Sequence, residues 1–107
     1  MNYQFDESQE QLLEMIGRDL LGSSGMSIDR KHLIAIGEKW IEKQWSHLQE
    51  VVCTSKITQH LLKNTDEVIL VGAIADIISG ICIGVTPSTV ATLITRIGLK
   101  NFCNLSK

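Results

Sequence analysis

The feature that most constrains the fold is an apolar run over residues 68–85, VILVGAIADIISGICIGV, in which Asp76 is the single charged residue. Eighteen mostly apolar residues reach the lower limit of length for a helix that crosses a bilayer. A carboxylate near the middle of a span is penalised by roughly 3 kcal/mol, and no cluster of Lys or Arg flanks the run. A helix that is apolar on all sides can also be the central helix of a bundle. We therefore expect a buried bundle helix here, with a membrane-embedded segment as the alternative.

Small residues recur within this run at four-residue intervals. Gly72, Gly80 and Gly84 share this spacing with Asp76, so all four fall on one face of a helix. Gly80 and Gly84 also form a GxxxG pair, which lets a second helix approach closely in lipid or in a protein core. We predict that Gly80 and Gly84 pack against a neighbouring helix of the same domain.

Capping residues and apolar periodicity predict helices before the run. The pair Asp6 and Gln9 has the spacing of a capping box and opens a helix over about 7–21, which Gly22 ends. The longest helix follows, capped at Ser27 and continuing to about residue 53. A short helix over about 55–63 comes next, after which Asn64 or Thr65 can cap the apolar run.

The end of the run predicts a chain reversal between Gly84 and Pro87. Thr86 is a suitable N-cap and Pro87 suits the first position of a last helix over about 87–97. The run and this helix then form an apolar C-terminal helical hairpin. Residues 1–107 are thus predicted to be a single all-α domain, a compact bundle of about five helices within a range of four to six.

Two tryptophans lie on or beside the apolar stripe of the longest helix, at Trp40 and Trp45. Aromatic residues in such a stripe are more often core than ligand contacts. We expect Trp45 to be the better candidate for partial exposure and for contact with a partner.

The predicted hairpin brings two charges to a similar height. Asp76 lies about ten residues before Thr86 and Arg96 about ten after it, so both stand on the order of 15 Å from the turn. We predict a buried, structural ion pair between Asp76 and Arg96. The alternative is that Asp76 is an unpaired carboxylate with a perturbed pKa and a functional role.

Charge and motifs exclude several classes of function. The formal net charge is -2, which gives no overall attraction for nucleic acid. The sequence has no GxSxG, GxxxxGK[ST], GxGxxG or HExxH motif. The three histidines, at positions 32, 47 and 60, are too far apart for a metal-binding pair. We expect no enzymatic activity, no cofactor and no metal site.

The cysteines bear on the cellular setting. Cys53, Cys82 and Cys103 form no CxxC pair, and their odd number leaves at least one thiol unpaired within the chain. A reduced, cytosolic setting is the simpler interpretation. The polar, acidic start MNYQFDESQEQ differs from a secretory signal, so we expect no export.

In size and helix content the chain resembles small helical adaptors of signalling assemblies, such as death-fold modules. This similarity is architectural and involves no specific set of residues. We expect a cytoplasmic helical protein–protein interaction or adaptor module that can self-associate. One alternative is a membrane-associated or membrane-inserting hairpin over residues 68–99. Another is a small enzyme or ligand-binding bundle that uses Asp76, Arg96 or a histidine.

Overall fold

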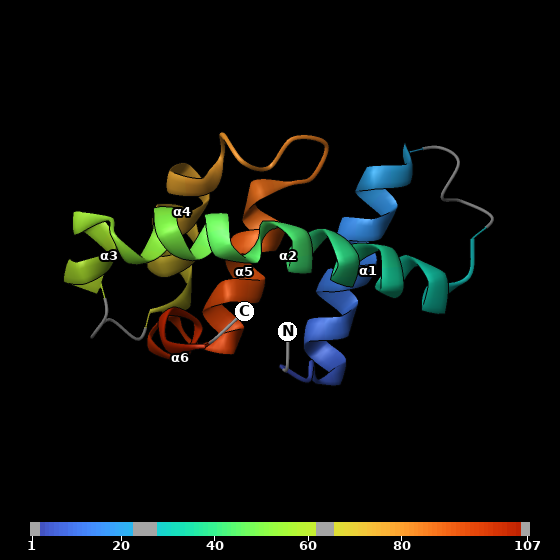
Figure 1. Cartoon of the computed structure of the whole chain (residues 1–107), viewed down its shortest axis with the longest axis horizontal. Coiled ribbons are helices and arrows are strands. Elements are labelled where there is room, and N and C mark those ends of the chain that lie inside the picture. The colour runs from blue at the N-terminus through green and yellow to red at the C-terminus, as the bar shows by residue number, and fades with distance from the viewer. Residues whose placement is uncertain (1–2, 23–27, 62–65, 106–107) are drawn as a thin grey trace.

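The computed structural model describes residues 3–22, 28–61 and 66–105. Six helices and no strand occur within these ranges, which confirms the predicted all-α bundle. The helices are α1 Glu7–Leu21, α2 Arg30–Cys53, α3 Lys56–Leu61, α4 Glu67–Ile78, α5 Pro87–Ile97 and α6 Leu99–Asn104. Figure 1 shows α2 lying across the other helices, with α1 behind its N-terminal half and α4 and α5 behind the rest. The molecule is elongated, with extents of 42 × 25 × 23 Å.

Local capping chemistry sets the helix starts. The predicted capping box is confirmed, since the Gln9 N–H donates to Asp6 Oδ1 at 2.9 Å and the Asp6 N–H donates to Gln9 Oε1 at 3.0 Å. The prediction for α2 was wrong by two residues, because the N-cap is Asp29, whose side chain accepts from the His32 N–H. Ser27, predicted for that role, lies outside the described residues.

The cap of α4 also differs from the prediction. Asp66 caps this helix and accepts from the N–H groups of Val68 and Ile69, at 3.0 and 3.4 Å. The predicted caps Asn64 and Thr65 lie outside the described residues. An aspartate at the N-terminus is also favoured by the helix dipole.

The apolar run does not form one continuous helix. Helix α4 ends at Ile78, and residues 79–86 form turns in which the Ile81 and Cys82 N–H groups donate to the Ile78 carbonyl. Ser79, Gly80 and Gly84 have low helix propensity, and Gly84 has φ +82°, which other residues rarely adopt. Helices α4 and α5 run in opposite directions and pack together, so the predicted hairpin is present with a longer turn. Within the described residues no helix has both the length and the apolar character needed to cross a membrane.

The core lies between α2 and the helices beneath it. Its largest fully buried side chains are Trp45, Phe102, Leu13, Ile16, Leu33, Ile41, Leu48, Ile74, Ile78, Leu93 and Ile94. The rings of Trp45 and Phe102 meet edge to face with centroids 4.8 Å apart. Helix α6 thus contributes a central aromatic residue although it has only six residues.

Two buried glycines allow α1 and α2 to cross at close range. A Cβ added at Gly17 would overlap the backbone carbonyl of Leu33, and one added at Gly37 would overlap that of Leu13. Each helix therefore offers a glycine to the backbone of the other. Only glycine permits such an approach, because any side chain would force the backbones apart.

A disulfide joins Cys53, at the end of α2, to Cys103 in α6. Their Cα atoms are 5.7 Å apart and 50 residues apart in sequence. Cys82 is buried and free, and desolvation raises the pKa of its thiol to about 11. The expectation of reduced thiols is therefore wrong for Cys53 and Cys103, because the fold brings distant positions together that sequence spacing does not reveal.

Candidate interaction surface

Helix α4 has an exposed face that begins with two large apolar side chains. Leu70, Ile74 and Ile78 are buried in the core, whereas Val68 is 82% exposed and Ile69 is 50% exposed. Gly72 and Asp76 continue this side of the helix and are also exposed. We call the surface made by Val68, Ile69, Gly72 and Asp76 the α4 outer face. Val68, Gly72 and Asp76 are spaced four residues apart and follow one stripe of the helix. Ile69 lies three residues before Gly72 and borders this stripe, so the four residues form one continuous surface.

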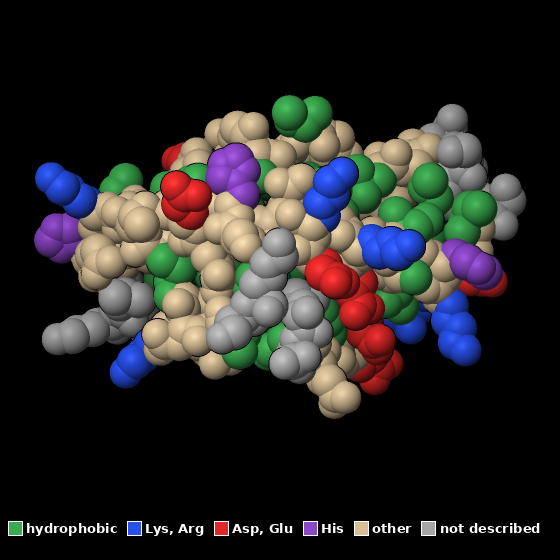
Figure 2. Space-filling model, in the orientation of Figure 1, with side chains coloured by type: hydrophobic (Ala, Val, Ile, Leu, Met, Phe, Trp, Pro, Cys, Tyr) green, Lys and Arg blue, Asp and Glu red, His purple; other side chains and the backbone are tan. Residues whose placement is uncertain are grey.

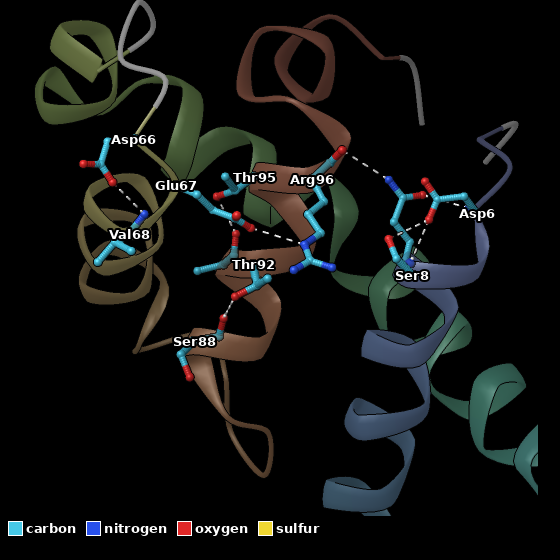
Figure 3. Close-up of polar contacts among 11 residues, drawn as sticks. Asp6, Ser8, Asp66, Glu67, Val68, Ser88, Thr92, Thr95 and Arg96 are labelled. Atoms are coloured by element: carbon cyan, nitrogen blue, oxygen red, sulfur yellow. Dashed lines mark hydrogen bonds and ion pairs between the residues drawn. The ribbon is translucent and has the colours of Figure 1, made fainter.

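The start of α4 is capped and is tied to α5 by an ion pair. Asp66 caps the first turn through the backbone N–H groups of Val68 and Ile69, which fixes the backbone while their side chains point outward. Figure 3 shows Glu67 reaching from α4 towards Arg96 on α5, and the Arg96 Nε donates to Glu67 Oε1 at 3.2 Å. Both side chains are partly exposed, so water weakens this ion pair. Its role is to fasten the first turn of α4 to α5.

The predicted buried ion pair between Asp76 and Arg96 is wrong. Both residues are exposed, and Arg96 pairs with Glu67 at the other end of α4. The pairing required the faces of the two helices to agree, which the sequence left open, and Asp76 lies on the side of α4 that faces away from Leu70 and Ile74. Arg96 also contacts α1, because its backbone carbonyl accepts a hydrogen bond from the Gln9 side-chain Nε2 at 3.3 Å.

The prediction that Gly80 and Gly84 form a helix-packing pair is also wrong. Both follow the end of α4, and an added Cβ at Gly80 would have no neighbour within 4 Å. Gly84 serves the turn through its positive φ, and its nearest side-chain neighbour is Leu20. Close helix packing occurs instead at Gly17 and Gly37, which sequence reasoning missed. Their shared pattern LxxIG, at 13–17 and 33–37, was the available signal.

Trp45 is not the exposed tryptophan that we predicted. Its side chain is 1% exposed, whereas Trp40 is only partly buried against the core. The Trp45 indole N–H has no hydrogen-bond partner among the described residues. Trp45 is therefore a core residue beneath Phe102, and it contributes no contact surface in this state.

The rest of the described surface offers no clear catalytic arrangement. No group of three His, Cys, Asp or Glu side chains within the described ranges could hold a metal ion. An open hollow of about 340 Å³ between α1 and α2 is lined by Leu21, Ile28, Asp29, His32 and Ile36. Its polar pair, Asp29 and His32, is engaged in capping α2. Figure 2 shows acidic side chains gathered in one band on this face, with basic side chains scattered around it.

Comparisons with known proteins give no further assignment, because no protein family, curated protein or solved structure matches the chain.

Proposed function

We propose that this chain is a helical protein–protein interaction module without catalytic activity, and that it binds through the α4 outer face. The observation that supports this proposal is the exposure of Val68 and Ile69 on a capped helix. Burying one such side chain in an interface is favourable by roughly 1.5–3 kcal/mol. Gly72 lies beside them with no atom within 4 Å of an added Cβ, so a partner helix can approach closely there.

The first partner to test is a second copy of the chain. We expect light scattering of the 107-residue chain to show an average mass that rises with concentration. Val68→Lys should weaken this association by about tenfold or more, because it places a charge in an apolar contact. The matched control is Ile83→Lys, since Ile83 is 81% exposed but lies in the turn beyond the other end of α4.

Two results would contradict this proposal. A mass equal to that of the monomer at every concentration would reject self-association. Equal weakening by Val68→Lys and Ile83→Lys would reject the α4 outer face as the contact.

The cellular compartment of the protein is a separate question. The cytoplasmic location expected above stays a prediction. A disulfide between Cys53 and Cys103 is more typical of an oxidising compartment, or of a redox-responsive protein in a reducing one.

A further inference from the structure

Helix α6 is held against α2 by a small set of contacts. Phe102 is fully buried against Trp45, and Leu99 is buried beside α5. The Gln49 side-chain Nε2 donates to the carbonyls of Phe102 and Leu105, at 2.8 and 2.6 Å. The disulfide from Cys53 to Cys103 adds a covalent cross-link between these two helices.

The junction between α5 and α6 can act as a hinge. Gly98 separates the two helices and has φ +96°, a conformation that glycine adopts without strain. Helix α6 has six residues, too few to be stable as a helix without packing. If its contacts with α2 are lost, α6 can move and unwind about Gly98 while α1 to α5 keep their packing.

The disulfide prevents this motion. Cys103 directly follows Phe102, and consecutive Cα atoms are 3.80 Å apart. With the Cα of Cys103 held 5.7 Å from that of Cys53, the Cα of Phe102 stays within about 9.5 Å of the Cys53 Cα, which keeps α6 beside the C-terminal end of α2. The closed state also leaves the Trp45 indole N–H without a protein partner among the described residues. Opening would let water satisfy this donor, which offsets part of the cost of exposing the Trp45 and Phe102 side chains.

We propose that Cys53–Cys103 is a redox-controlled clasp, and that its reduction by a dithiol releases α6 from α2 and uncovers Trp45. One thiolate of the reductant attacks a sulfur of the disulfide to give a mixed disulfide, and its second thiol resolves this intermediate. Two electrons pass to the protein, Cys53 and Cys103 each gain a proton, and the reductant leaves as its own disulfide. Both cysteines are only partly buried, so a reductant can reach them.

The third cysteine does not interfere with this chemistry. Cys82 is buried and desolvation raises the pKa of its thiol, so little of the reactive thiolate forms at neutral pH. The Cys82 thiol therefore neither attacks the disulfide nor forms a competing disulfide with Cys53 or Cys103.

Amide hydrogen exchange of the full chain, with and without dithiothreitol, tests the clasp. In the reduced protein we expect the amides of Phe102 and Leu105 to exchange at least about tenfold faster than those of Ile41 and Trp45 in the middle of α2. In the oxidised protein we expect the two sets to exchange at similar rates. This comparison separates local release of α6 from a general loss of stability, which would accelerate all four amides together.

Variants supply the controls. Cys82→Ala should keep the full response to dithiothreitol, and Cys53→Ser should show fast exchange in α6 without any reductant. If Cys53→Ser does not fold, the wild-type comparison still decides the question. Similar exchange rates for α6 and the middle of α2 in the reduced protein would overturn the proposal, as would three free thiols in the air-oxidised protein.

Discussion

At the residue scale, two glycines decide how closely α1 and α2 pack. Gly17 has no room for a Cβ, because the Leu33 carbonyl occupies that position. We expect Gly17→Ala to lower the free energy of unfolding by about 1–3 kcal/mol through overpacking. The control is Gly72→Ala in α4, where nothing lies within 4 Å, and there a gain of about 0.5–1 kcal/mol is expected from helix propensity. Urea denaturation measures both, and an unchanged midpoint for Gly17→Ala would show that the helices do not cross as described.

At the element scale, the start of α5 depends on a side chain from another helix. Thr86 donates its N–H and its hydroxyl to Asp19 Oδ2, at 3.0 and 2.8 Å, so its hydroxyl does not cap α5 itself. Asp19 lies in the last turn of α1, where a negative charge interacts unfavourably with the dipole of α1. The same carboxylate faces the N-terminus of α5, where a negative charge is favourable.

We expect Asp19→Ala to lower the free energy of unfolding by about 1 kcal/mol, the usual effect of losing a cap. The matched control is Asp76→Ala, an exposed aspartate on α4 that should change stability by less than about 0.5 kcal/mol. Thermal unfolding compares the two variants. Equal effects would mean that Asp19 does not anchor α5.

At the scale of the whole molecule, the pKa shifts set the pH range of stability. Three carboxyl groups have lowered pKa values, mainly because each accepts a hydrogen bond. The donor to Asp6 is the Gln9 N–H, and the donor to Asp29 is the His32 N–H. The donor to Glu14 is the Arg18 guanidinium. A lowered pKa in the folded state stabilises the fold above the unfolded values of 3.8 and 4.5, and this contribution is lost as the pH falls further.

We therefore expect the melting temperature to fall on acidification below about pH 4.5. Cys82 limits stability at the alkaline end. Burial raises the pKa of its thiol from 9.0 to about 11. Burial of the neutral thiol therefore favours the folded state below pH 9, and this contribution is lost as the pH rises from 9 towards 11. Thermal melts from acid to alkaline pH measure both limits, with Cys82→Ala as the control for the alkaline one. A melting temperature that rises on acidification would contradict the carboxylate interactions.

The sequence by itself determined the all-α class, the approximate number of helices, the capping box at Asp6 and Gln9, and the Thr86–Pro87 start of α5. These features depend on residues a few positions apart, so local propensity and periodicity are sufficient to predict them. The exposed part of the candidate site, Val68 and Ile69, was not predicted, because an evenly apolar helix does not show which side it buries.

Only the tertiary structure decided the contacts between distant residues. It pairs Arg96 with Glu67, joins Cys53 to Cys103, buries Trp45 beneath Phe102, and crosses α1 and α2 at Gly17 and Gly37. Each of these depends on how helices rotate about their axes and where they cross. Helix rotation and crossing are set by the packing of the whole core, and no short stretch of sequence contains that information.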